Sequence, residues 1–141
     1  MSMKKALLTI STFCFALFFS QKNQNYLEIS YSSICCGTPS EEPVISSLKQ
    51  FEKKNRIKGM EILLQSGLGR EGEFNLYVAT DPLNGKQKKQ LIQKLSSVIA
   101  LQNGKRRQNS TGFVNFDPAT SVSGTDLMNI KNLTIYKNKG K

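Results

Sequence analysis

Two adjacent cysteines, Cys35 and Cys36, are the side chains of this 141-residue chain best suited to chemistry. Thiols can join in a disulfide, and thiolates bind soft metal ions. The chain has no histidine, and its third cysteine, Cys14, lies in a leader segment that we expect to be removed. A structural zinc site, which needs four nitrogen or sulfur ligands, is therefore not expected in the mature chain.

Three interpretations of the cysteine pair stay open. The two sulfurs can form a vicinal disulfide, although neighbouring Cα atoms lie closer together than the partners of an ordinary disulfide. As free thiols they suit Cu(I) binding or a thiol-redox reaction. Alternatively, one cysteine packs as a small hydrophobic residue while the other is half exposed, and Gly37 and Thr38 simply form a turn.

Basic residues form the second candidate site. Residues 21–81 hold 7 Lys and Arg against 8 Asp and Glu, whereas residues 82–141 hold 11 against 2. A solvated helix exterior explains such residues, and so does an anionic partner: a membrane surface, an acidic polysaccharide or an acidic protein. We expect no nucleic acid, because we expect export and because only Tyr77 is placed to stack on bases. The candidate anion-binding residues are Lys86, Lys88, Lys89, Lys94, Lys105, Arg106 and Arg107.

A glycine-rich segment at residues 67–72, GLGREG, matches the pattern G-x-G-x-x-G. A dinucleotide-binding loop requires that pattern between a strand and a helix. Here strands are predicted on both sides, so glycines that accept positive φ in a hairpin explain the pattern. The tip residues Arg70, Glu71 and Glu73 are candidates for a partner contact, since loops often carry binding residues.

Catalytic groups are hard to assemble from this sequence. Without histidine the commonest general acid or base is missing, and a cysteine nucleophile lacks its usual base. Glu41 and Glu42 are explained by their place at a helix start, and Glu71 and Glu73 lie on an exposed hairpin. We therefore expect no enzymatic activity, with a thiol-based redox reaction as the exception.

Alternation and helix signals place these residues on predicted elements. Leu27, Ile29 and Tyr31 share one side of the segment NYLEISYSS, as in a half-buried strand. Pro43 is tolerated only in a first helical turn, which favours Ser40 as the N-cap of the next helix. The predicted elements are a strand at 25–33, a helix from Ser40 to about 54, strands at 58–66 and 73–80, a helix at 84–102, a short strand at 113–116, a loop at 117–131 and an added edge strand at 132–137.

This β-α-β-β-α-β order predicts an α+β fold of the ferredoxin-like type, a split β-α-β sandwich with two helices on one face of an antiparallel sheet. The cysteine loop then lies before the first helix, whose N-terminus lowers the pKa of a thiol. In element order and loop position the chain resembles the heavy-metal-associated domains, whose two cysteines are separated by two residues. The resemblance implies capture of a soft metal ion such as Cu(I) by Cys35 and Cys36.

The first twenty residues read as a signal peptide. Lys4 and Lys5 precede an uncharged run at residues 6–19, which is too short for an ordinary transmembrane helix. We favour cleavage after Ser20, with cleavage after Ala16 and lipidation of Cys14 as alternatives. The chain then divides into a signal peptide (1–20), a ferredoxin-like domain (21–116) and a loop, edge strand and basic tail (117–141).

The mature chain is therefore expected in the periplasm or outside the cell, without a transmembrane segment. It carries 18 Lys and Arg against 10 Asp and Glu, a net charge of +8. These features predict a small exported binding module whose basic second half contacts an anionic partner. The alternative function is a periplasmic soft-metal or thiol-redox protein that acts through Cys35 and Cys36.

Overall fold

The computed structural model describes residues 24–107 and 112–137 and has an α+β fold. The predicted signal peptide and its cleavage site lie outside these residues. Within them, no helix is both long and apolar enough to cross a membrane. The elements are β1 (Asn25–Ser32), α2 (Glu42–Asn55), β2 (Ile62–Gln65), β3 (Phe74–Ala79), α3 (Gly85–Gly104), β4 (Phe113–Ser123), α4 (Gly124–Leu127) and β5 (Leu133–Ile135).

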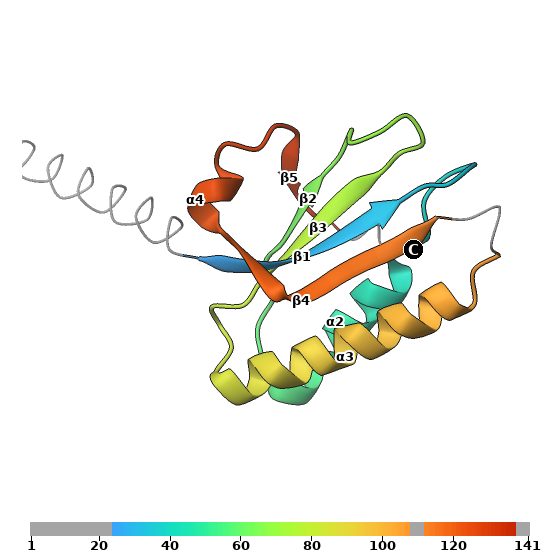
Figure 1. Cartoon of the computed structure of the whole chain (residues 1–141). Helices are drawn as coiled ribbons and strands as arrows, with labels where there is room; N and C mark the ends of the chain where they lie inside the picture. The colour runs from blue at the N-terminus through green and yellow to red at the C-terminus, as the bar shows by residue number, and fades with distance from the viewer. Residues whose placement is uncertain (1–23, 108–111, 138–141) are drawn as a thin grey trace, which may run out of the picture.

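The five strands form one sheet in the order β4-β1-β3-β2-β5, and every neighbouring pair is antiparallel. Both long helices, α2 and α3, lie side by side on one face of this sheet, while α4 and the segment leading to β5 lie on the other side (Figure 1). The predicted edge strand is present, because β5 pairs with β2 at the end of the sheet.

The main core fills the space between the sheet and the two long helices. Strand alternation explains it, since Leu27, Ile29 and Tyr31 of β1 are each at most 1% exposed. The buried members contributed by the helices are Val44, Ile45, Leu48 and Phe51 of α2 and Leu91, Leu95 and Ile99 of α3. Fully burying a side chain of this size contributes about 1.5–3 kcal/mol.

The opposite face of the sheet is partly covered, which the sequence prediction did not include. Tyr26 and Tyr77 point to this face, and α4 places Leu127 against them. Tyr77 is only 1% exposed, and its hydroxyl donates to Gln65 Oε1 at 2.9 Å. Tyr77 therefore lies on the face away from the long helices but is not available to stack on bases, because the segment after β4 covers it.

Strand β4 is longer than predicted. It runs to Ser123, whereas the sequence predicts a loop from residue 117, so the strand crosses the proposed domain boundary at 116. The difference arises at residues 117–120, which all lie opposite Glu28 as a bulge. The Asp117 carboxylate holds the bulge by accepting from the Ala119 N–H at 2.9 Å and the Thr120 hydroxyl at 2.7 Å.

Helix α2 begins one residue later than predicted. Glu41, rather than Ser40, occupies the N-cap position, and Glu41 makes no side-chain capping bond. Ser40 Oγ still accepts from the Glu42 N–H at 3.1 Å, so the residue contributes to the helix start from just outside it. Pro43 lies in the first turn, as its missing N–H requires.

Candidate functional site

Helix α3 positions the first group of candidate residues. Its start is fixed by a capping box, in which the Gln87 N–H donates to Asn84 Oδ1 at 2.8 Å and the Asn84 N–H donates to Gln87 Oε1 at 3.1 Å. Leu91, Leu95 and Ile99 then recur at a four-residue spacing and are buried against the sheet. The lysines lie off this buried stripe, with Lys86 and Lys89 exposed and Lys88 and Lys94 partly exposed.

Helix α2 adds basic residues that the sequence prediction missed. Lys49, Lys53 and Lys54 are exposed on it, and the two helices lie next to each other (Figure 1). The predicted element order already places both helices on one face of the sheet, so this grouping could have been anticipated. We call the combined surface the basic helical face; it comprises Lys49, Lys53, Lys54, Lys86, Lys88, Lys89, Lys94, Lys105, Arg106 and Arg107.

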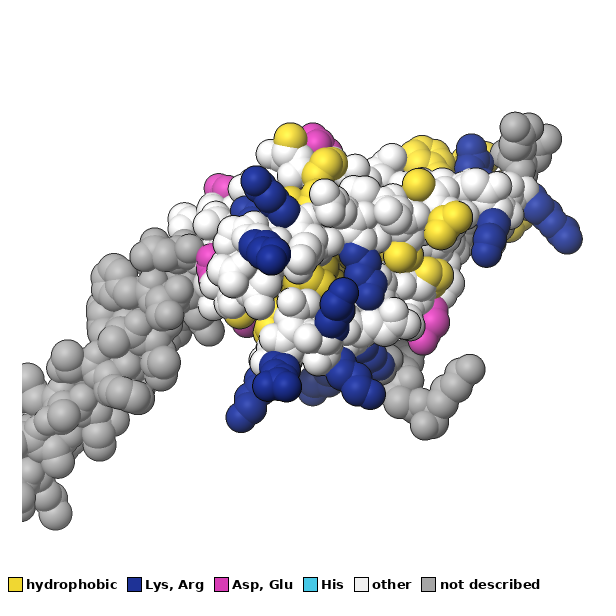
Figure 2. Space-filling view, turned by 90° about the horizontal axis from the view of Figure 1, so that it is seen from below, with side chains coloured by type: hydrophobic (Ala, Val, Ile, Leu, Met, Phe, Trp, Pro, Cys, Tyr) yellow, Lys and Arg dark blue, Asp and Glu magenta, His cyan; other side chains and the backbone are white. Residues whose placement is uncertain are grey.

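Figure 2 views the molecule from this side and shows Lys and Arg side chains gathered over the helices, with the visible acidic side chains toward the edges. A polar groove of about 320 Å³ lies between the helices. Its lining residues are Phe51, Lys54, Asn55, Gln90, Gln93, Lys94 and Ser97. Lys94 Nζ donates across the groove to Gln50 Oε1 at 3.4 Å. The groove therefore combines amide donors with positive charge, which suits anionic oxygen atoms.

The seven predicted basic residues do not form one compact cluster. A 20-residue helix is about 30 Å long, so Lys86 and Lys105 lie at opposite ends of α3. The guanidinium carbon of Arg106 lies 5.8 Å from the centre of the Phe113 ring, and this side chain is partly buried. Arg106 thus packs onto the fold, while Lys105 is exposed. An anionic ligand that contacts all of these residues must be extended.

The charges at the start of α3 oppose its dipole, whereas Lys105 at the C-cap favours it. The helix has no acidic residue in its first turn and no basic residue in its last turn, and residues 82–116 contain no Asp or Glu at all. Positive charges near a helix N-terminus are unfavourable, each by about 0.3–1 kcal/mol at an exposed position. Lys86 and Lys88 therefore lower the stability of α3, and no acidic residue within residues 82–116 offsets this effect.

The cysteine loop connects β1 to α2. Cys35 and Cys36 are both exposed, and the structure joins their Sγ atoms in a vicinal disulfide. Cys36 and Gly37 have positive φ values of 71° and 108°, so the backbone turns sharply at the pair. Neither cysteine packs in the core, which removes the structural interpretation of one buried thiol. Among the described residues, no group of three or more His, Cys, Asp or Glu is placed to hold a metal ion.

The glycine-rich segment is a hairpin between β2 and β3. Gly67 and Gly72 have positive φ values of 73° and 83°, as the hairpin interpretation expects. Arg70 and Glu71 are exposed at its tip. Glu73 instead folds back, and its Oε2 accepts from the Glu71 N–H at 3.0 Å. The structure therefore leaves Arg70 and Glu71 available for a contact and uses Glu73 to hold the turn.

Comparison with known protein families, with curated proteins and with solved structures finds no match to this chain.

Proposed function

We propose that this chain is a small exported binding module, without enzymatic activity, that binds an extended polyanion through the basic helical face. We further infer that its core is ferredoxin-like. The strand order β4-β1-β3-β2 and the two helices on one face support that assignment, with β5 as an added edge strand. An acidic polysaccharide, an anionic membrane surface and an acidic protein share the chemistry that this face would recognise.

The placement of lysines at the start of α3 is the observation that carries this proposal. Stability alone favours acidic residues there and basic residues at the opposite end. The chain instead keeps Lys86, Lys88 and Lys89 next to the N-terminus, and the nearest acidic residue in sequence, Asp81, lies before the helix and accepts from the Asn25 N–H. A ligand with negative charge gives these residues a function that offsets their cost in stability.

The test compares two variants that remove equal charge. Lys86→Gln/Lys89→Gln removes two exposed charges from α3, and Lys58→Gln/Lys131→Gln removes two exposed charges elsewhere. Calorimetric titration with heparin, and sedimentation with vesicles containing phosphatidylglycerol, are each done at about 0.05 M and 0.5 M salt. We expect the α3 variant to weaken binding at least about fivefold at low salt, and the control to change it less than twofold. Equal losses in both variants would contradict a specific face.

The carboxyl end of the face has its own test. The triple variant Lys105→Ala/Arg106→Ala/Arg107→Ala should weaken binding of a long heparin chain more than that of a short heparin fragment. A short fragment can bind at one end of α3 only, because the two ends lie about 30 Å apart. If the triple variant binds long heparin as well as the unmodified protein does, this end of α3 does not belong to the site.

The exposed disulfide supports a second candidate function, a thiol-redox protein. Both sulfurs are accessible, so a dithiol reductant can attack one of them. The exchange transfers two electrons and two protons, which converts the Cys35–Cys36 disulfide to two thiols and the dithiol to its disulfide. The two reduced thiols are also the only protein ligands that we propose for Cu(I).

Intact-mass analysis after alkylation without reductant tests this second function. A disulfide leaves the protein unalkylated and 2 Da lighter than the dithiol, while reduction with dithiothreitol should allow two alkylations. Adding Cu(I) to the reduced protein then tests metal capture, with Cys35→Ser and Cys36→Ser as controls. Alkylation of the untreated protein at both cysteines would remove the redox candidate.

A further inference from the structure

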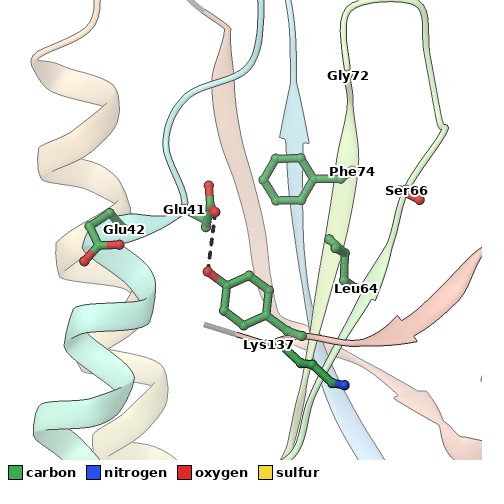
Figure 3. Close-up of a pocket in the computed structure, with 8 residues that line it drawn as sticks. Glu41, Glu42, Leu64, Ser66, Gly72, Phe74 and Lys137 are labelled. Carbon is green, nitrogen blue, oxygen red and sulfur yellow. Dashed lines mark hydrogen bonds between the residues drawn. The ribbon is translucent and has the colours of Figure 1, made fainter. Parts of the chain in front are cut away.

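A cleft of about 350 Å³ lies at the opposite end of α2 from its basic last turn. It is formed by the start of α2, the β2–β3 hairpin and the segment after β5 (Figure 3). Its lining residues are Glu41, Glu42, Leu64, Ser66, Gly72, Phe74, Tyr136 and Lys137. Glu41 and Glu42 both come from the start of α2, and the Glu42 carboxylate points away from Glu41 and Phe74 (Figure 3).

A hydrogen bond closes the inner part of this cleft. The Tyr136 hydroxyl donates to Glu41 Oε1 at 3.4 Å, a long contact that leaves the second carboxylate oxygen of Glu41 for another donor (Figure 3). Lys137 extends away from both carboxylates in the same view. In the part of the chain that the structure describes, neither Glu41 nor Glu42 forms an ion pair with a basic side chain.

Tyr31 forms the wall behind Phe74. The two rings stack with their centres 4.4 Å apart and their planes 10° apart. Tyr31 is 1% exposed, and its hydroxyl has no hydrogen-bond partner among the described residues. A buried hydroxyl without a partner costs about 1–3 kcal/mol. Tyr31 does not line the cleft itself, so its contribution is to support the Phe74 ring from behind.

The electrostatic potential near the Glu41 carboxylate is negative. Burial raises the pKa of the Tyr31 hydroxyl, and the charge of Glu41 raises it further. The pKa of Tyr136 is also raised, first by burial and then by Glu41. Both shifts place the Tyr31 and Tyr136 hydroxyls within the field of the Glu41 carboxylate, and a positive group in the cleft would be attracted by the same field.

We propose that this cleft binds a guanidinium group on a short apolar stem, as in an arginine side chain of a partner peptide. A planar guanidinium can stack on Phe74 or Tyr136 while it donates to the carboxylate of Glu41, and the exposed Glu42 adds negative charge nearby. Leu64 provides apolar surface for the stem.

This site is separate from the basic helical face and opposite to it in charge. Its ligand is a cation, and the residues that line it do not belong to that face. Loss of heparin binding would leave this proposal intact, and loss of guanidinium binding would leave the polyanion proposal intact. The two can therefore fail independently.

A pair of isosteric probes tests the proposal. N-acetyl-arginine amide carries one positive charge, and N-acetyl-citrulline amide has nearly the same shape without the charge. Binding is followed by NMR chemical-shift changes of backbone amides at residues 64–74 and 136. We expect the arginine probe to bind with a Kd on the order of 1 mM, about −4 kcal/mol, and the citrulline probe to bind at least about fivefold more weakly.

Variants of the cleft sharpen the result. Glu41→Gln should weaken arginine-probe binding about threefold to tenfold, and Glu42→Gln should weaken it by a smaller factor, because the Glu42 carboxylate points away from Phe74. Glu71→Gln removes an exposed carboxylate outside the cleft and should have no effect. Circular dichroism confirms that each variant is folded; Glu42 is exposed, so its variant is a suitable second test if Glu41→Gln fails to fold. Equal binding of the two probes, or no shift with the arginine probe at 20-fold the expected Kd, would overturn the proposal.

Discussion

Helices α2 and α3 bury similar apolar stripes against the same sheet, yet the charged residues in their first turns have opposite signs. In α2, Glu42 lies in the first turn and Lys53 and Lys54 lie in the last, so each charge favours the helix dipole. In α3 the first turn has Lys86 and no acidic residue, and the basic residues at the other end begin with Lys105 at the C-cap. The apolar stripes explain how both helices pack. The lysines at the start of α3 are unfavourable for the helix dipole, so neither packing nor helix stability explains them.

The largest expected effects come from the buried stripes and should be equal in the two helices. Leu48 in α2 is 1% exposed and Leu95 in α3 is 0% exposed. Leu48→Ala and Leu95→Ala should each lower the free energy of unfolding by about 2–5 kcal/mol, because each leaves a cavity in the main core. Urea denaturation followed by circular dichroism measures both. A loss under about 1 kcal/mol in either variant would contradict the close packing of that helix.

Alkaline pH should reveal the burial of Tyr31, with a smaller contribution from the charge of Glu41. The raised pKa of Tyr31 means that its neutral form is favoured in the folded protein, so its stabilising contribution is present below pH 10 and is lost as the pH rises above it. Between pH 10 and pH 11 we expect a loss of about 1 kcal/mol from Tyr31.

Tyr31→Phe is the matched variant for this experiment. It should increase stability at pH 8 by about 1 kcal/mol, because it removes a buried hydroxyl without a partner. It should also make the loss between pH 10 and pH 11 smaller than in the unmodified protein. Urea denaturation at pH 8, 10 and 11 provides the comparison, and an unchanged alkaline loss in Tyr31→Phe would show that other groups cause it.

Charge reversal should affect the two helices in opposite directions. Lys86→Glu/Lys88→Glu should increase the free energy of unfolding by about 0.5–1.5 kcal/mol, whereas Lys53→Glu/Lys54→Glu should lower it by a similar amount. The α3 variant should at the same time lose heparin binding. Denaturation at about 0.05 M salt keeps the charges unscreened. If the α3 variant is destabilised, the lysines at the start of α3 stabilise the fold, which would contradict the contrast between the two helices.

The smallest effect on stability is expected at the cysteine loop. Cys35→Ser and Cys36→Ser each remove the exposed disulfide without opening the core. Each should change the free energy of unfolding by no more than about 0.5 kcal/mol, as is usual for surface positions. Thermal denaturation of both variants checks this, and a larger loss would show that the loop holds the start of α2 in place.

Local patterns in the sequence predict the elements that bury a regular stripe. Alternation in β1 correctly identifies Leu27, Ile29 and Tyr31 as core residues. The continuation of β4 could not be predicted in this way, since Asp117 and Pro118 are typical turn residues and interrupt the pattern. The bulge that they form is recognised only when β1 lies beside them.

The candidate sites differ in the same respect. The basic helical face is visible in the sequence, because lysines that avoid an apolar stripe must lie on the outside of a helix. The cleft cannot be predicted from the sequence, because Glu41, Phe74 and Tyr136 are far apart in the chain. Only the sheet and its last strand bring them together. Burial of Tyr77 was missed for a related reason, since its cover is the short helix α4.

The two edge strands of the sheet, β4 and β5, also affect whether copies of this protein can pair edge to edge. An outer strand presents unpaired N–H and C=O groups, and a long, flat outer strand can add a neighbouring copy edge to edge, which leads to aggregation. Here β5 is only three residues long, and β4 is interrupted by a four-residue bulge that contains Pro118. A proline lacks the N–H that such a pairing needs. The bulge that interrupts the sequence pattern of β4 therefore also disfavours edge-to-edge pairing at this strand.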